Sequence, residues 1–175
     1  SGHSYMSSFT TLGLAPSILK VLDRLKFTVP TPIQEKAIPV AIAGNDVVGI
    51  AQTGTGKTLA FALPMIQRIA KTKQKGLIML PTRELAIQVD EALIQVGGAF
   101  GIRTAILIGG ASMYHQLVAL KKNPHVIIGT PGRIMDHLEQ KTLNLQHVGV
   151  VVLDEGDRML DMGFAPQFNK IMGHV

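Results

Sequence analysis

The stretch that decides the fold is Ile50-Ala51-Gln52-Thr53-Gly54-Thr55-Gly56-Lys57-Thr58, which follows an apolar run and opens a segment with helical spacing. Its glycines let the backbone curl until several N–H groups point inward, which suits a phosphate group. Lys57 can reach the outer phosphates of a nucleotide, and the Thr58 hydroxyl can ligate Mg²⁺. The pattern favours a nucleoside triphosphate site, with Ala51 where such loops usually begin with glycine. The alternative is an ordinary glycine-rich turn, and the rest of the chain has to separate the two.

The composition is that of one globular domain with 175 residues and no cysteine. Structural disulfides, thiolate zinc sites and cysteine nucleophiles are therefore excluded. No apolar run approaches the roughly 20 residues that span a bilayer, and the first residues lack the layout of a signal peptide. We expect no membrane partner and an intracellular, cytoplasmic location. Residues 1–5 look like a remnant of recombinant expression, with Met6 as the native start.

The chain is moderately basic, with 17 Lys and Arg against 12 Asp and Glu and a formal charge of +5. This balance fits a polyanionic partner as well as it fits a solvated basic surface. The six histidines are scattered without a second ligand at metal-binding spacing. They are therefore expected to lie on the surface or in a satisfied core environment.

Short apolar runs alternate with amphipathic segments of helix length after the glycine-rich stretch. This alternation predicts an α/β fold with a mostly parallel sheet and helices on both faces. The carboxyl ends of all strands then meet at one edge, where ligands bind. The expected strands are 46–50, 76–80, 103–108, 125–128 and 148–153, and the expected helices between them are 57–71, 83–96, 112–120 and 131–140.

Three of these strands run into segments that suit anions. The second strand leads to Pro81-Thr82-Arg83, the third to Gly109-Gly110-Ala111-Ser112, and the fourth to Thr130-Pro131-Gly132-Arg133. Thr82, Ser112 and Thr130 are each placed to cap a helix, and the two arginines add planar cations beside the helix starts. Each segment alone is explained by a helix cap. Their common edge favours a phosphate backbone.

The fifth strand ends in Asp154-Glu155-Gly156-Asp157. Asp154 can hold Mg²⁺ through water, and Glu155 can orient or deprotonate the water that attacks the outer phosphate. The alternative is an acidic turn that pairs with Arg158. The glycine-rich stretch upstream favours the magnesium interpretation.

Taken together, these residues resemble the N-terminal RecA-like domain of a DEAD-box ATP-dependent RNA helicase, from Phe9 to Phe164. Residues 51–58 resemble motif I, 81–86 motif Ia, 109–110 the glycine doublet, 130–133 motif Ib and 154–157 motif II. Residues 27–34 resemble the Q motif that reads adenine. The resemblance implies a RecA-like P-loop domain over residues 6–175 that binds ATP and Mg²⁺.

The resemblance also implies roles for single residues. Phosphates contact the loop from Ala51 to Thr58, metal is held by Thr58 and Asp154, and catalysis rests on Lys57, Asp154 and Glu155. The adenine pocket is implied to contain Phe9, Phe27, Thr31 and Gln34, although a helix cap alone explains Gln34 locally. Asp157 is implied to link motif II to motif III or to a second domain. Single-stranded or short duplex RNA is implied to lie, through its sugar-phosphate backbone, along Pro81, Thr82, Arg83, Gly109, Gly110, Thr130, Pro131, Gly132 and Arg133.

The chain departs from the family pattern at three places. Lys26 stands where the Q motif usually has Gly, and Gly156 replaces the Ala of Asp-Glu-Ala-Asp. The sequence ends at Val175, before motif III and before the second RecA-like domain. In related folds the motif III strand lies between the strands of motif I and motif II, so we expect a gap in the sheet that another chain can fill. We also expect this fragment to be inactive in unwinding on its own.

Two other functions fit some of these residues. One is a clamp that uses ATP binding to hold RNA without efficient turnover, which the intact Lys57, Asp154 and Glu155 disfavour. The other is a translocase on double-stranded DNA, which the Q-motif match and Asp157 disfavour, because related families carry His at that position.

Overall fold

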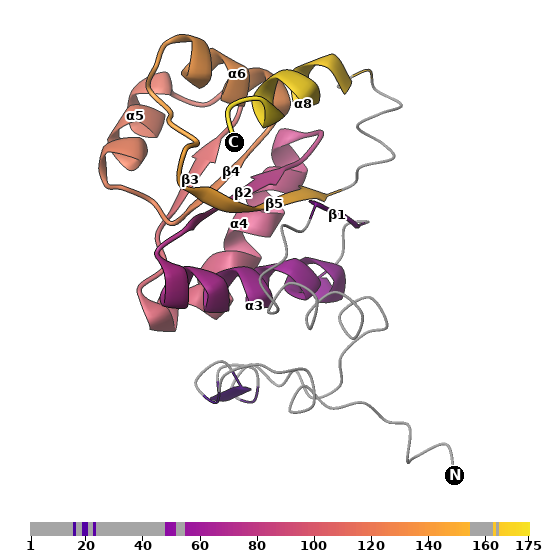
Figure 1. Cartoon of the computed structure of the whole chain (residues 1–175), viewed down its shortest axis with the longest axis vertical. Helices are drawn as coiled ribbons and strands as arrows, with labels where there is room; N and C mark the ends of the chain where they lie inside the picture. Colours follow the sequence, from indigo (N-terminus) through magenta and orange to yellow (C-terminus); the bar gives the residue numbers. More distant parts are fainter. Residues whose placement is uncertain are drawn as a thin grey trace.

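The computed structural model describes residues 16, 19, 20, 23, 48–51, 55–154, 163 and 165–175, and for 48–51, 55–62, 64, 154 and 165 it describes the backbone alone. Within this part the chain forms a five-stranded sheet with the order β1-β5-β2-β4-β3, and every neighbouring pair is parallel. The predicted parallel sheet is confirmed (Figure 1). The strands are β1 (Val48–Ala51), β2 (Lys75–Met79), β3 (Thr104–Leu107), β4 (Val126–Gly129) and β5 (Val148–Asp154).

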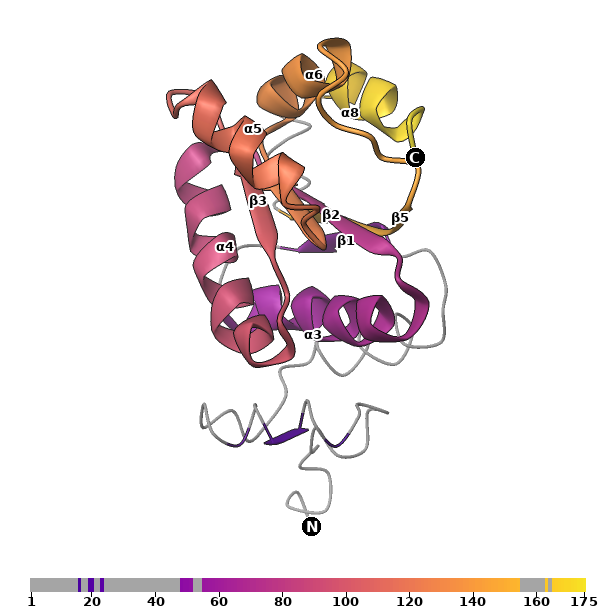
Figure 2. The same cartoon turned by 90° about the vertical axis from the view of Figure 1, so that its left-hand side faces the viewer.

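Helices cover both faces of this sheet, as the alternating pattern predicted. Helices α3 (Thr55–Thr72) and α4 (Arg83–Gly97) pack on one face. Helices α6 (Pro131–Glu139) and α8 (Ala165–Met172) pack on the other, and α5 (Met113–Lys121) lies beside β3. Figure 2 shows α3 on one side of the sheet and α6 with α8 on the opposite side. A short 3-10 helix, η3 (Gly98–Phe100), follows α4.

The strands hold the core because alternate residues enter opposite layers. In β5, Val150 and Val152 join the layer under α3 and α4, whereas Val151 and Leu153 join the layer under α6 and α8. All four side chains are at most 5 % exposed. Burying one such side chain contributes about 1.5–3 kcal/mol relative to leaving it in water. The continuous apolar run therefore specifies a strand that is covered on both faces.

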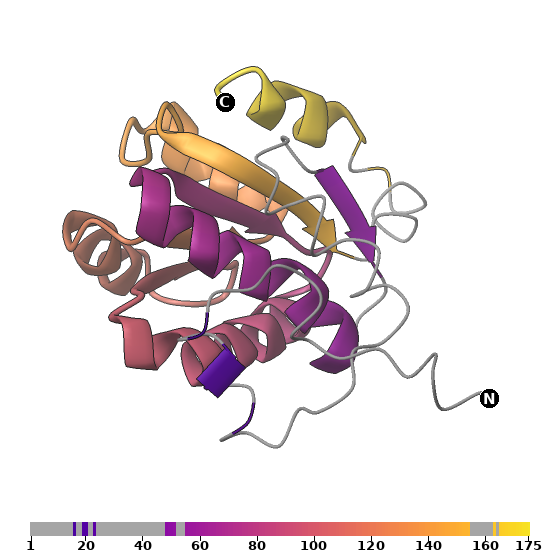
Figure 3. The same cartoon turned by 60° about the horizontal axis from the view of Figure 1, so that its bottom comes forward.

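The expected gap between the strands of motif I and motif II is absent. Strand β1 pairs directly with β5, from Val48 beside Val151 to Ala51 beside Asp154. Figure 3 shows the two strands pointing in the same direction. The hydrogen bonds between β1 and β5 use the backbone N–H and C=O groups that a gap would have left unpaired. The prediction of a gap, and of a neighbouring chain that fills it, was therefore wrong.

Candidate nucleotide and RNA site

The backbone register brings the start of the glycine-rich stretch to the acidic strand end. Ala51 and Asp154 are direct partners in neighbouring parallel strands. Such strands lie about 4.8 Å apart. Helix α3 begins at Thr55, only four residues beyond Ala51. The N–H groups at the start of that helix carry partial positive charge, and a carboxylate-bearing residue lies at the same sheet edge. This arrangement fits a phosphate group with its metal ion.

Several predicted site residues lie outside the part of the chain that the structure describes. They are Phe9, Phe27, Thr31, Gln34, Gln52, Thr53, Gly54, Glu155 and Asp157. For Ala51, Thr55, Gly56, Lys57, Thr58 and Asp154 the backbone alone is described. Their roles remain predictions. Within the described residues, no three side chains of His, Asp or Glu gather as a metal site.

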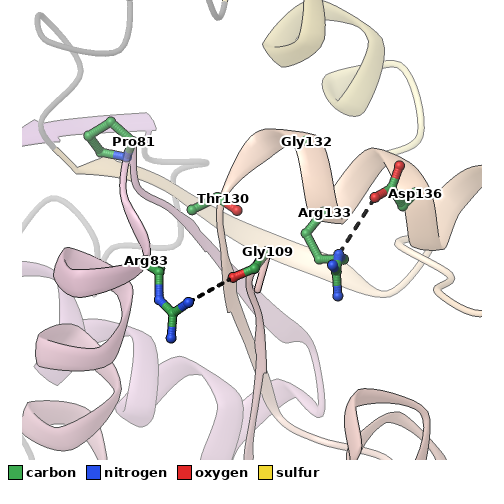
Figure 4. Close-up of a pocket in the computed structure, with 7 residues that line it drawn as sticks. All are labelled: Pro81, Arg83, Gly109, Thr130, Gly132, Arg133 and Asp136. Carbon is green, nitrogen blue, oxygen red and sulfur yellow. Dashed lines mark hydrogen bonds and ion pairs between the residues drawn. The ribbon is translucent and has the colours of Figure 1, made fainter. Parts of the chain in front are cut away.

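A second site is fully described at the carboxyl ends of β2, β3 and β4. An open pocket of about 440 Å³ brings together residues from the three segments that follow these strands. Figure 4 shows Arg83 and Arg133 on either side of Gly109 and Thr130. The predicted common edge is therefore real. The lining residues are Pro81, Arg83, Gly109, Thr130, Gly132, Arg133 and Asp136.

The helix caps at this edge differ from one another. The side chain of Thr82 accepts a hydrogen bond from Leu85 N at 3.3 Å, and Ser112 accepts one from His115 N at 3.3 Å, so both predicted caps are confirmed. The predicted side-chain cap of Thr130 was wrong, because no such bond forms at the start of α6. The backbone N–H of Thr130 extends the ladder between β4 and β3 by donating to Leu107 O at 3.1 Å.

Arg83 lies loosely on the glycine doublet. Its NH1 group is 3.5 Å from Gly109 O, at the limit of a hydrogen bond, and its side chain is 47 % exposed. Gly110 has φ +77, and a Cβ atom there would collide with NH1 of Arg83. The glycine doublet thus has a physical reason, because it combines a left-handed turn with close approach of an arginine.

Replacing Gly110 by alanine is expected to displace Arg83 and to strain the turn by about 1 kcal/mol. We expect the affinity for single-stranded RNA to fall several-fold while the fold is kept. Fluorescence anisotropy with a labelled oligouridylate measures the affinity, and circular dichroism checks the fold. Gly98→Ala is the matched control, because Gly98 has right-handed φ and open space around its Cβ position. Equal RNA affinity for both variants would contradict the role given to Arg83.

Arg133 is held more firmly than Arg83. Its NH1 group donates to Ala111 O at 3.3 Å and to Gln116 Oε1 at 3.3 Å. Its Nε lies 3.6 Å from Asp136 Oδ2, and the arginine side chain is only 17 % exposed. Three partners on α6, α5 and the loop before α5 therefore define where this guanidinium lies. Such a preset planar cation suits a phosphate oxygen.

Two buried polar side chains, Gln116 and His137, lie behind Arg133, and the contact between them was not predicted. Gln116 is 4 % exposed and His137 is 0 % exposed. His137 was expected to be a surface or satisfied core residue, and it is the second of these: Nε2 lies 2.8 Å from Gln116 Oε1, and Nδ1 lies 2.8 Å from Thr142 Oγ1. No local pattern signals this contact, because Gln116 and His137 are 21 residues apart.

Burial lowers the pKa of His137, Arg133 lowers it further, and Asp136 acts in the opposite direction. The folded chain then binds fewer protons at this ring than the unfolded chain does. The free energy of unfolding should therefore fall as the pH drops below about 6.5, the pKa of a free histidine. We expect urea denaturation to show this fall between about pH 7.5 and pH 5.5, and His137→Gln to reduce it. His125, whose pKa is also lowered, accounts for a remaining part. An identical pH dependence in both proteins would contradict the assignment to His137.

Comparisons with known proteins agree with this geometry. The DEAD/DEAH box helicase family matches residues 31–175. The chain belongs to this family. It is 47 % identical over 172 residues to the DEAD-box ATP-dependent RNA helicase CshA of Geobacillus kaustophilus, and this match covers 97 % of the present chain and 37 % of that protein. It is 48 % identical over 168 residues to the ATP-dependent rRNA helicase RRP3 of Yarrowia lipolytica, which covers 94 % and 35 %.

A solved structure of the same family shares the fold. The crystal structure of a DEAD box protein from the hyperthermophile Methanococcus jannaschii matches with a TM-score of 0.85 and 39 % identity. The match covers 95 % of the present chain and 46 % of that chain. This DEAD-box chain thus spans about a third of the curated relatives, and less than half of the solved one. None of its described helices is long and apolar enough to cross a membrane.

Proposed function

We propose that this chain is the nucleotide- and RNA-binding RecA-like domain of an ATP-dependent RNA helicase. The observation that carries the proposal is the sheet order. Strands β1 and β5 bring Ala51 and Asp154 together, and β5 pairs next with β2, whose end leads to Pro81 and Arg83. The nucleotide side and the RNA side are therefore neighbours on one edge of one sheet.

On the nucleotide side, the residues fit ATP with a divalent metal ion. Bound Mg²⁺ would neutralise charge on the outer phosphates. Thr58 and Asp154 would hold it, with Asp154 acting through water. The N–H groups of residues 51–58 would bind phosphate oxygens, and Lys57 would contact the outer phosphates. Glu155 would orient the attacking water and accept its proton.

The adenine pocket and the link to a second domain complete this proposal. Gln34 would hydrogen-bond the adenine edge, and Phe27, supported by Phe9 and Thr31, would contact the base. Asp157 would connect motif II with motif III or with a second RecA-like domain of a longer protein. The lengths of the relatives support such a second domain, because the match covers 37 % and 35 % of them.

On the RNA side, the pocket offers two guanidinium groups and a threonine hydroxyl. Within the described residues, Thr130 Oγ1 makes no hydrogen bond, and Thr130 lines the pocket. Arg83, Arg133 and this hydroxyl can bind phosphate oxygens and the 2′-OH groups of a single strand. Contacts to the RNA sugar-phosphate backbone do not distinguish one base from another, so the proposed binding is independent of the RNA sequence. A cytoplasmic location is part of this proposal, and cell fractionation tests it.

The decisive experiment measures ATP hydrolysis with and without oligouridylate in a protein that carries this chain and its second RecA-like domain. We expect RNA to stimulate hydrolysis, Glu155→Gln to abolish the stimulated rate, and Glu155→Gln to keep ATP and RNA binding. The present chain alone is expected to bind both ligands weakly and to hydrolyse ATP inefficiently. RNA binding that depends on ATP without stimulated hydrolysis would identify a clamp in place of a helicase. No binding of either ligand would refute both functions.

A further inference from the structure

Gln116 and His137 are a buried, hydrogen-bonded pair of side chains, and Gln116 also contacts Arg133. Gln116 lies on α5 and His137 on α6, so this pair joins two helices that follow different strands. Buried polar side chains are costly unless every group finds a partner. We therefore ask which partners satisfy these two side chains and which group the pair holds in place.

The hydrogen bonds define which way the Gln116 amide points. Its Nε2 group donates to Ile108 O at 2.8 Å. A carbonyl oxygen only accepts, so the amide nitrogen has to face Ile108, and Oε1 has to face Arg133 and His137. Oε1 thus accepts from Arg133 NH1 at 3.3 Å and from His137 Nε2 at 2.8 Å.

The same logic defines the protonation of the imidazole ring. Because Gln116 Oε1 is an acceptor, Nε2 of His137 has to carry a hydrogen. In the neutral ring Nδ1 is then an acceptor for the Thr142 hydroxyl at 2.8 Å, and the single hydrogen of this hydroxyl has His137 O at 3.1 Å as its second acceptor. A turned amide would place its oxygen against Ile108 O and its N–H groups against the guanidinium, and it would force the ring into the other tautomer.

The hydrogen bond to Gln116 helps to fix the orientation of the Arg133 guanidinium. Arg83 in the same pocket has one contact at 3.5 Å to a carbonyl and a distant contact of 4.0 Å to Glu84, and it is 47 % exposed. Arg133 has two acceptors at 3.3 Å for one NH1 group. A side chain that is already ordered loses less entropy when it binds a phosphate.

We propose that Gln116 and His137 are positioning residues that hold the Arg133 guanidinium in the orientation in which it binds a phosphate of single-stranded RNA. Gln116 contacts the guanidinium directly, and His137 keeps the Gln116 amide turned toward it. The proposal rests on the proposed RNA-binding function of this edge. It adds that RNA affinity depends on two side chains that are themselves buried and out of reach of the nucleic acid.

The test measures the affinity of the chain for a fluorescein-labelled oligouridylate at low salt. Arg133→Gln is expected to weaken binding about tenfold, as loss of a charge-assisted contact to phosphate does. Gln116→Met, which keeps the volume and removes the amide, is expected to weaken it about three- to fivefold. The matched control is Gln95→Met, which replaces an exposed glutamine on α4 and is expected to leave the RNA affinity unchanged.

A double-mutant cycle separates positioning from a general loss of structure. In the Arg133→Gln background, Gln116→Met should have no further effect, because the residue acts through Arg133. Equal losses in both backgrounds, or no loss in the unaltered background, would overturn the proposal. If Arg133→Gln itself leaves RNA binding unchanged, the RNA-binding role of this edge fails, which is a different result.

His137 supplies an independent pair of variants if Gln116→Met does not fold. The amide nitrogen of His137→Gln can take the place of Nε2, whereas that of His137→Asn lies near the position of Nδ1. We expect His137→Gln to keep RNA affinity within about twofold and His137→Asn to lose as much as Gln116→Met. Equal affinities for the two variants would overturn the role of the ring N–H, whatever their stabilities.

Discussion

Replacing Gly129 by alanine is expected to lower the free energy of unfolding by about 2–3 kcal/mol. Gly129 is the last residue of β4, and its Cβ position lies 2.5 Å from Leu107 O and 3.1 Å from Ile134 Cγ1. The first of these atoms is backbone in the neighbouring strand and cannot rotate away. The sheet itself would have to open between β4 and β3, at the point where Thr130 N donates to Leu107 O at 3.1 Å.

Urea denaturation of both proteins measures this loss. Gly132→Ala is the matched control, three residues away in the first turn of α6, because its Cβ position has no neighbour within 4 Å. Alanine is favoured over glycine in a helix by up to about 1 kcal/mol, so the control should be unchanged or slightly more stable. Equal unfolding free energies for Gly129→Ala and the unaltered chain would show that the strand end yields easily.

The second large effect is expected at Asp154. Asparagine at this position keeps the size and removes the charge that would hold Mg²⁺ through water. In a protein with both RecA-like domains, we expect Asp154→Asn to reduce RNA-stimulated ATP hydrolysis at least about 100-fold. The physical reason is its place in the sheet: it ends β5 directly beside Ala51, where the glycine-rich stretch proposed to bind phosphate begins.

A coupled assay for released phosphate measures the rate, over a range of magnesium concentrations. Glu91→Gln is the control, since Glu91 is an exposed acid on α4 and lines no part of the described pocket. Turnover of Asp154→Asn within tenfold of the unaltered protein would remove Asp154 from the proposed metal site. Recovery of the rate at high magnesium would instead support a weakened metal site.

Periodicity predicted the elements well because their burial follows from local sequence. Runs such as Val148 to Leu153 are apolar at every position, which suits a strand that is covered on both faces. The predicted bounds differ from the observed ones by at most two residues: the strand expected at 46–50 is Val48–Ala51, and the helix expected at 57–71 is Thr55–Thr72. Helix ends depend on individual hydrogen bonds, so small shifts there are expected.

Contacts between distant segments were the part that the sequence left open. The pairing of β1 with β5 closed the expected gap, because the two strands satisfy each other's backbone groups. The Thr130 cap was wrong, because its side chain accepts no hydrogen bond from the first turn of α6. The contact of its backbone N–H with Leu107 O is also one that the residues around Thr130 do not reveal. The sequence likewise treated Arg83 and Arg133 alike. The structure distinguishes them by the buried Gln116 behind one of them.

The sequence by itself determined that the chain forms a parallel α/β domain and that the segments after its strands share one edge of the sheet. This follows because apolar alternation and glycine spacing are local properties that every copy of the chain carries. Only the tertiary structure decided the strand order, and with it which arginine is preset and which glycine is crowded. Those properties depend on atoms that are far apart in the chain, such as Leu107 O beside Gly129 and Gln116 Oε1 beside Arg133.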